Sequence, residues 1–289
     1  MDSNARIRVI IPCRGAGADI FRTLASLASQ TVGPKRQNVI LASSAPEEHA
    51  DAEASLLRKA LGFNSVEVLD ASALPEAKAV NIAALDGGEQ TLALAPEGAR
   101  LSPRFLEACL HAMRGHHAAA SFPLHTAGSQ DAAPLVRLRP FSAEQLTRGN
   151  PVGPAVLVRR EAWESLGGLR PGARLALWDF WLRLALSGGT GGTGGRIVRV
   201  QELLAHCPPL RRLSAREDGE AKALLVAGAP GAFDPDTCRW ALALLRGEGW
   251  AKPFTPGVIP SAHEIRAMHA AALRPRGFAR AFRQELRSA

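Results

Sequence analysis

Tyrosine is absent from this 289-residue sequence, and no apolar run approaches the roughly 20 residues that a membrane-spanning helix needs. The opening residues, 1–6, lead directly into a segment of strand character and contain neither the long apolar core nor the cleavage site of a signal peptide. These absences predict a cytoplasmic protein. The composition, with 46% hydrophobic and 21% charged residues, is typical of a globular chain and excludes a disordered one.

Cysteine is scarce, and its spacing argues against two kinds of site. The four cysteines, Cys13, Cys109, Cys207 and Cys238, form no CxxC pair. Neither a zinc site nor a disulfide scaffold is therefore expected. We expect reduced cysteines that mostly serve packing.

Acidic residues are fewer than basic ones, and the formal net charge is +8. This balance favours anionic partners, namely nucleotides, phospholipid surfaces or nucleic acids. Because the sequence contains no RNA-binding motif that combines aromatic and basic residues, nucleic acid is the least favoured of the three.

The first 115 residues alternate regularly between strand-like and helix-like segments. The hydrophobic periodicity predicts strands at 6–12, 38–42, 66–69 and 90–94, and helices at 20–30, 47–61, 76–85 and 103–113. Such alternation predicts an α/β fold with a parallel sheet covered by helices on both faces. Because ligands of these sheets bind beyond the carboxyl ends of the strands, the loops at 12–17, 43–46 and 95–100 should surround one site.

The second half of the chain is less regular. It predicts strands at 155–158 and 197–200, and helices at 161–166 and 178–186. The glycine-rich segment 188–195 follows a helix and precedes a strand, whereas a phosphate-binding loop needs a strand before it and a helix after it. A flexible connector is the favoured interpretation of this segment.

Six segments in the same order and spacing resemble the family 2 glycosyltransferases of the GT-A type. They are residues 9–14 with 24–31, 81–89, 101–107, 148–151, 159–169, and the tryptophan-rich helix 178–185. The resemblance implies a GT-A domain over 1–205, with a nucleotide-binding half at 6–100 and an acceptor half at 101–205. It also implies transfer of a sugar from a nucleotide-sugar donor to a glycan or to a lipid-linked acceptor.

The resemblance assigns site residues by position. It places Pro12, Arg14, Ser43, Ser44, Asn81 and Glu97 around the nucleotide sugar, and Asn150 and Trp178 on the acceptor side. Two of these have an equally ordinary structural interpretation. Arg14 is also compatible with a surface residue, and a tryptophan at a helical position among leucines and alanines is more often part of the core.

Three acidic motifs of the family are missing. Residues 42–45 replace the motif whose Asp binds the nucleotide, and residues 95–98 replace the metal-binding DxD, which leaves Glu97 as the one carboxylate. The Mg²⁺ or Mn²⁺ that the resemblance implies is therefore in doubt, because hard cations need several carboxylate oxygens. Ala176 and Leu177 stand where the family has its catalytic base. Asp179 is the nearby substitute, although an acid at the start of a helix commonly serves capping.

Two functional interpretations therefore stay open. The first is an active transferase with an unusual site built around Glu97, Asp179 and the loop of Ser43 and Ser44. The second is a catalytically inactive relative that binds or scaffolds another protein. A nucleotidyltransferase is a weaker third alternative, because no basic, glycine-rich loop of the expected form follows the first strand.

The segment 206–289 is expected to form a basic, helical C-terminal extension, with helices at 236–246 and 261–272. In a final helix at 274–289, Phe278, Phe282 and Leu286 would lie opposite a row of arginines. Such a helix can lie on the inner face of an anionic membrane, or it can pack its apolar side against the domain.

Overall fold

The computed structural model describes residues 5–14, 17–45, 50–127, 141–188, 195–209 and 213–273. Its contacts divide the chain into two units. Unit 1 comprises Met1–Leu146 and Asn150–Arg211, and unit 2 comprises Thr147–Gly149 and Arg212–Ala289. The boundary expected after residue 205 falls inside the last strand of unit 1, and strands from the two ranges 6–100 and 101–205 share one sheet.

Unit 1 is built on an eight-stranded sheet with the order β3-β2-β1-β4-β7-β6-β8-β5. The strands are β1 (Ile7–Cys13), β2 (Gln37–Ser43), β3 (Ser65–Asp70), β4 (Thr91–Leu94), β5 (Arg100–Leu101), β6 (Ala120–Ala127), β7 (Val156–Arg159) and β8 (Ile197–Cys207). The helices are α1 (Ala18–Ala28), α2 (Ala50–Leu61), α3 (Glu76–Leu85), α4 (Phe105–Gly115), α5 (Arg160–Ser165) and α6 (Ala176–Ser187). The expected α/β class with a mostly parallel sheet is confirmed.

The strand directions bring most carboxyl ends to one edge of the sheet. Strands β1, β2, β3 and β4 are parallel, and β7 is antiparallel to both β4 and β6. Strand β6 therefore runs in the direction of β4, and β8 is parallel to β6. We call the edge at which β1, β2, β3, β4, β6 and β8 end the carboxyl edge.

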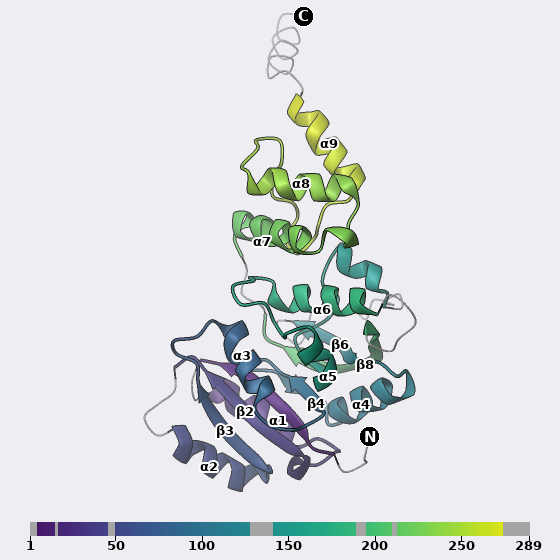
Figure 1. Ribbon diagram of the computed structural model, residues 1–289. Helices are drawn as coiled ribbons and strands as arrows, with labels where there is room; N and C mark the ends of the chain where they lie inside the picture. The colour runs from purple at the N-terminus through teal and green to yellow at the C-terminus, as the bar shows by residue number, and fades with distance from the viewer. Residues whose placement is uncertain are drawn as a thin grey trace, which may run out of the picture. The chain divides into compact units, whose positions relative to one another are not determined.

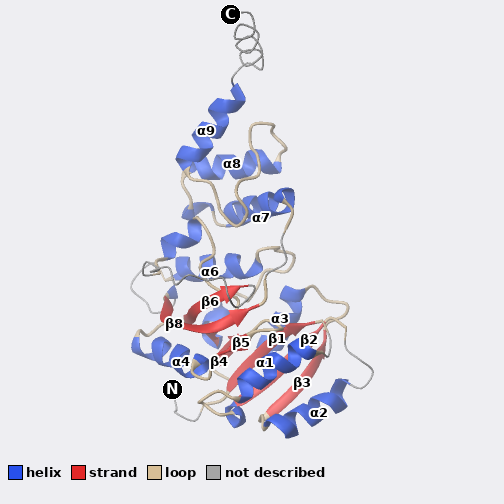
Figure 2. Ribbon diagram, turned by 180° about the vertical axis from the view of Figure 1, so that it is seen from behind, coloured by secondary structure: helices blue, strands red, loops and turns tan. Residues whose placement is uncertain are grey.

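Helices cover both faces of this sheet. Helix α3 lies in front of it in Figure 1, whereas α1 and α2 lie on the other face in Figure 2. One large apolar cluster fills the space between the sheet and α1 and α4, and its members include Val9, Ile11, Leu24, Leu27, Phe105 and Leu106. Because β1 is buried on both faces, its sequence from Val9 to Cys13 is a continuous apolar run and does not alternate. Full burial of each leucine or phenylalanine contributes about 1.5–3 kcal/mol.

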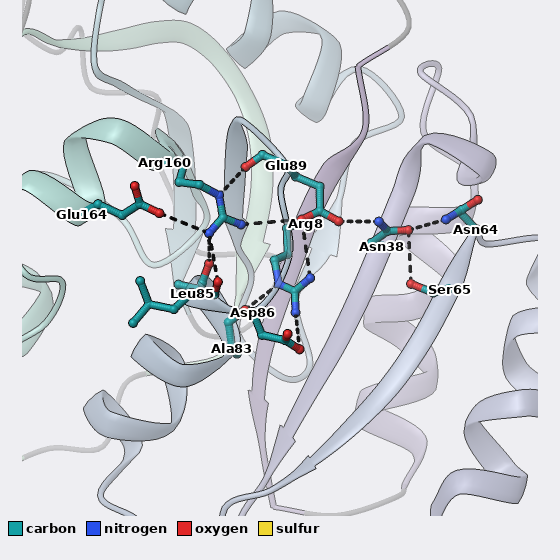
Figure 3. A network of polar contacts seen from close by, with 11 residues as sticks. Arg8, Asn38, Asn64, Ser65, Ala83, Leu85, Asp86, Glu89, Arg160 and Glu164 are labelled. Carbon is teal, nitrogen blue, oxygen red and sulfur yellow. Dashed lines mark hydrogen bonds and ion pairs between the residues drawn. The ribbon is translucent and has the colours of Figure 1, made fainter.

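A polar network closes the sheet at the end opposite the carboxyl edge (Figure 3). Arg8 on β1 is buried and donates from Nε to the carbonyl of Ala83 at 2.5 Å. Its Nη1 lies 3.5 Å from the carboxylate of Glu89, which also accepts a hydrogen bond from Asn38. Arg160 donates from Nε to the carbonyl of Glu89 at 2.6 Å. Burial acts to raise the pKa of Glu89, but the Asn38 hydrogen bond and the two arginines outweigh it, so that the pKa is lowered.

Unit 2 is helical, as expected, and contains α7 (Ala215–Gly228), α8 (Pro235–Leu245) and α9 (Ala262–Leu273). The expected helices at 236–246 and 261–272 correspond to α8 and α9, and α7 was not expected. Lys222 on α7 is fully buried and donates to the carbonyls of Thr255 at 2.8 Å and Val258 at 2.9 Å. It also pairs with Asp218 at 2.5 Å. The hydrogen bonds from Lys222 to these two carbonyls therefore tie the loop before α9 to α7.

Two predictions concern residues outside the described ranges. The first is the connector predicted at the glycine-rich segment 188–195, of which most residues are not described, and the second is the amphipathic helix predicted at 274–289. In the part of the chain that the structure describes, no helix is both long enough and apolar enough to cross a bilayer.

Candidate active site

The loops after β1, β2 and β4 meet at the carboxyl edge, as the sequence predicts. Ser44 donates from its backbone N to the carbonyl of Cys13 at 2.9 Å, which joins the first two loops. The backbone N of Arg14 donates to Glu97 Oε2 at 3.0 Å, which joins the first loop to the loop after β4. Ser43 is buried at the end of β2, whereas Ser44 and the side chain of Arg14 are exposed. Pro12, Arg14, Ser43, Ser44 and Glu97 are thus brought together.

The loop after β4 packs on the start of α1, which brings in an acid that sequence reasoning missed. Gly98 has a left-handed backbone with φ of 81°, and a Cβ placed on it would lie 3.7 Å from the Cγ of Asp19. The hydroxyl of Thr23 lies 3.3 Å from the carbonyl of Asp19 and 3.4 Å from that of Pro96. The Asp19 carboxylate forms an ion pair with Arg22. Glu97 therefore has a second carboxylate in its neighbourhood, although that one has a partner.

These residues do not by themselves make a divalent-cation site. Among the described residues, no group of three or more histidine, cysteine, aspartate or glutamate side chains is arranged to hold a metal. Glu97 already uses one oxygen for the amide of Arg14, and Asp19 pairs with Arg22. Since Mg²⁺ and Mn²⁺ need several oxygen ligands, the site fits such an ion poorly. We therefore derive no step of the chemistry through a metal.

Asp179 lies in the first turn of α6 and is only 5% exposed. Its Oδ1 accepts a hydrogen bond from Arg170 at 3.0 Å, and its Oδ2 accepts one from Arg183 at 2.8 Å. Arg183 also donates to the carbonyls of Leu166 at 2.8 Å and Gly168 at 2.7 Å. We call Asp179, Arg170 and Arg183 the carboxylate clamp. In this arrangement both oxygens of Asp179 are occupied in holding the loop 166–170 against α6.

Asn81 on α3 is engaged with the same loop. Its Nδ2 donates to the carbonyl of Leu169 at 2.7 Å, and its Oδ1 accepts from the N of Leu169 at 2.8 Å. Gly168 allows this contact, because a Cβ there would collide with Asn81 Oδ1 and would lie 2.8 Å from Trp163 Nε1. The structure therefore gives Asn81 a part in fixing the loop, whereas its contact with a nucleotide stays a prediction.

The two acceptor-side residues differ in exposure. Trp178 is 3% exposed, and its Nε1 donates to the carbonyl of Leu146 at 2.7 Å. Its ring is therefore packed in the interior, which matches the structural interpretation of this tryptophan. Asn150 is exposed, and its Oδ1 accepts from the N of Val152 at 3.1 Å. The burial of Trp178 argues against stacking of its ring on an acceptor.

The structure also places two histidines at the carboxyl edge that sequence reasoning did not identify. His125 and Thr126 lie near the end of β6, and His206 lies near the end of β8. Thr126 Oγ1 lies 2.5 Å from His206 Nδ1, which links the two strands. His125 packs against Gly153, in the segment before β7. The sequence places His125 directly after an apolar run, but Pro123 within that run argued against a strand.

Comparison with known proteins identifies the fold. No family model matches the sequence, and no significantly similar curated protein was found. The chain is similar to the structure of S. aureus TarS 1–349, with a TM-score of 0.61 and 14% identity over 94% of this chain and 74% of that one. Against the longer TarS structure the identity is 13% and the TM-score 0.61, over 85% of this chain. The match covers 44% of that longer chain, so this chain spans less than half of its length.

A second similar structure is the mannosyltransferase PcManGT from Pyrobaculum calidifontis, in complex with GDP-Man and Mn²⁺. Its TM-score is 0.60 at 16% identity, over 98% of this chain and 80% of that one. TarS 1–349 has also been solved in complex with UDP-GlcNAc, and that complex has a TM-score of 0.61 and 12% identity over 82% of this chain and 70% of that one. Likeness at these identities shows the fold and not the activity. The chain has the GT-A fold of family 2-like glycosyltransferases.

Proposed function

We propose that the protein is a glycosyltransferase that binds a nucleoside-diphosphate sugar at the carboxyl edge and transfers the sugar to a hydroxyl acceptor. The observation that carries this proposal is the meeting of the loops after β1, β2 and β4, joined by the hydrogen bond from Arg14 N to Glu97. The GT-A fold supports it, because the similar structures of TarS and PcManGT contain UDP-GlcNAc and GDP-Man.

The residues of this edge suit a nucleotide ligand in a particular way. The Ser43 and Ser44 loop offers hydroxyl and backbone groups for the nucleoside, and Arg14 is the cation that we assign to the diphosphate. Pro12 shapes the end of β1. Glu97 accepts a hydrogen bond from the backbone N of Arg14 and so fixes the loop that carries this arginine.

With a nucleoside-diphosphate sugar as the donor, the bonds that form and break in the proposed reaction are defined. The oxygen of the acceptor hydroxyl bonds to the anomeric carbon, and the bond from that carbon to the diphosphate oxygen breaks. The diphosphate leaves with the electron pair, and a base takes the hydroxyl proton. For the acceptor we propose a glycan or a lipid-linked sugar, and Asn150 is the exposed residue that we assign to its side of the site.

A second function is favoured by one observation. Both oxygens of Asp179 are held by arginines, and among the described residues no group of acidic side chains is arranged to hold a metal, which fits a protein that binds nucleotide sugars without turning them over. In that case, donor binding would be retained and no nucleoside diphosphate would be released. The two functions therefore differ in turnover and agree in binding.

Calorimetry with UDP, GDP, UDP-GlcNAc and GDP-mannose, with and without Mn²⁺, tests the shared step. We expect binding of at least one donor, and an Arg14→Ala variant should bind it about tenfold or more weakly, since a charge-assisted hydrogen bond is worth about 1.5–3 kcal/mol. The matched control is Arg216→Ala, which removes an exposed arginine from unit 2. Absence of binding to all four ligands would exclude both functions.

Membrane contact through 274–289 is a separate proposal that rests on the sequence alone. The opposed rows of phenylalanine and arginine suit an anionic membrane on the cytoplasmic side, where a lipid-linked acceptor would be met. Sedimentation with vesicles of phosphatidylglycerol and phosphatidylcholine tests it. Binding to these vesicles that persists unchanged after deletion of 274–289 would contradict this proposal.

A further inference from the structure

The end of β6 brings an imidazole to the same edge as Glu97. Because β6 runs in the direction of β4, the carboxyl end of β6 and the loop after β4 lie at the same edge of the sheet. Strand β7 lies between them in the sheet order. His125 is located close to the end of β6, and the link between Thr126 and His206 holds that end beside β8.

The pairing of β7 shows how His125 and Glu97 are placed. Strand β6 pairs with β7 through Ser121 and Leu157, and beyond this pair the ring of His125 lies against Gly153. On its other side, β7 pairs with β4 through Val156 and Leu94. Gly153 and Glu97 are each three residues beyond that pair, at the edge where the strands end. Neighbouring strands are about 4.8 Å apart, so His125 and Glu97 lie at the same edge, on either side of the segment that contains Gly153.

The ring of His125 is held flat against the backbone of Gly153. A Cβ at Gly153 would lie 2.5 Å from His125 Nδ1, 2.7 Å from Cε1 and 2.8 Å from Cγ. Only glycine permits this approach, because no real Cβ is tolerated at such distances. The glycine is therefore a positioning residue for the imidazole.

The hydrogen-bonding state of His125 is unusual for a packed histidine. It is half-buried, and within the described residues no hydrogen bond is made to either ring nitrogen. Burial lowers the pKa of His125 from its ordinary value, which favours the neutral ring, and a neutral imidazole has one unprotonated nitrogen that can accept a proton. A histidine with a purely structural part usually pairs at least one ring nitrogen.

The other acidic or basic groups near this edge are already engaged. Asp179 is held by two arginines, and Asp19 pairs with Arg22. Glu97 accepts the amide of Arg14, which places it on the donor side. Among the described groups of this edge that are named here, His125 is the one for which no polar partner is described, whereas one oxygen of Glu97 and Nδ1 of His206 are engaged.

We propose that His125 is the general base that deprotonates the acceptor hydroxyl in the transfer reaction, an inference that rests on the proposed function. The hydroxyl proton moves to the unprotonated ring nitrogen of His125 as the oxygen bonds to the anomeric carbon. The bond from that carbon to the diphosphate breaks, and the diphosphate leaves with the electron pair. The protonated imidazole then returns its proton to water.

The test uses the full chain, with UDP-GlcNAc and GDP-mannose as donors and water as the acceptor. Donor affinity is measured by calorimetry, and release of UDP or GDP is measured in a coupled assay. A His125→Gln variant should lose about 10²- to 10⁴-fold in turnover and should keep its donor Kd within about twofold. The control is His111→Gln, which changes an exposed histidine on α4 and should keep wild-type turnover.

A pH profile separates a base from a structural residue. Wild-type turnover should rise with pH through a value below the ordinary histidine pKa of about 6.5, and this limb should vanish in His125→Gln. Gly153→Ala should displace the ring and lower turnover, with donor affinity retained. If His125→Gln does not fold, the titration of His125 in the wild type, followed by NMR, supplies the pKa. A titration at or above 6.5 would overturn the assignment.

The remaining outcomes are distinguishable. If neither donor binds, the proposed function fails and the base assignment fails with it. If a donor binds and the wild type releases no nucleoside diphosphate, nucleotide-sugar binding stands and the assignment of His125 is overturned. Equal turnover in wild type and His125→Gln, or a parallel loss of donor affinity in that variant, overturns it as well.

Discussion

Replacing Asp179 by asparagine tests whether the carboxylate clamp stabilises the fold and whether Asp179 is a base. The side chain of Arg183 is 11% exposed, so loss of the carboxylate leaves a nearly buried guanidinium without a counter-ion. Breaking such a pair typically costs about 3–5 kcal/mol. Arg183 keeps its bonds to the carbonyls of Leu166 and Gly168, and Arg170 is half-exposed. We therefore expect the lower end, about 3 kcal/mol.

This magnitude can be measured by thermal and urea denaturation of Asp179→Asn. At about 2–4 °C per kcal/mol for a chain of this size, the Tm should fall by about 6–12 °C. A control is Glu202→Gln, which removes an exposed ion pair with Arg104 in the same unit and should cost at most about 1 kcal/mol. A loss below about 1 kcal/mol in Asp179→Asn would refute the clamp. Turnover retained by the folded variant would exclude Asp179 as the base.

Three further predictions concern stability. Gly168→Ala should destabilise unit 1 by about 1–3 kcal/mol in urea denaturation, because its φ is 69° and a Cβ would collide with Asn81. The pKa of Glu89 is lowered below 4.5 in the folded state, so its ion pairs stabilise the fold above that pH. This contribution is lost as the pH falls through the folded-state pKa. The difference in free energy of unfolding between wild type and Glu89→Gln should therefore shrink between pH 7 and pH 3. Lys222→Met should destabilise unit 2 by about 3–5 kcal/mol, since it leaves the buried Asp218 unpaired, and hydrogen exchange of α7 should report the loss. An unchanged hydrogen-exchange rate of α7 in Lys222→Met would contradict a stabilising contribution of the Lys222–Asp218 ion pair.

Local patterns in the sequence were enough to predict the first half of unit 1. Strands β1 to β4 are short apolar runs between turn residues, and helices α1 and α3 follow their predicted ranges closely. The local hydrophobic pattern of these elements agrees with their burial in the folded unit. Each could therefore be predicted from its own residues. The carboxyl-edge rule then predicted correctly that the loops of Arg14, Ser43 and Glu97 would meet.

Elements that depend on distant partners were missed. Strand β6 contains Pro123, which normally argues against an interior strand, and its register with β8 shifts on both sides of Leu124. Helix α7 contains Gly219, which weakens a helical prediction, yet a Cβ there would lie 3.0 Å from Pro253. Its capping box, in which Ser214 and Glu217 bond reciprocally, was a readable start signal.

The candidate site illustrates the same limit. His125 gains its environment from Gly153, which lies far along the chain and has no side chain to announce a contact. Asp179 shows the converse, because its position suggested a base and its partners Arg170 and Arg183 make it part of a clamp. The strand order therefore predicted which loops would meet, while the state of each group depended on neighbours that the motif does not contain.

The placement of charge explains how this site can differ from one built on acids. Glu89 forms ion pairs at the end of the sheet opposite the carboxyl edge, and Asp179 forms ion pairs that hold the loop 166–170. At the edge itself, Glu97 accepts a backbone amide, and Arg14 remains exposed. An anionic diphosphate would then meet a cationic side chain instead of a metal, and the acceptor proton would meet a neutral imidazole instead of a carboxylate. In the proposed site, this exchange lowers the negative charge around the donor, which favours the binding of a diphosphate.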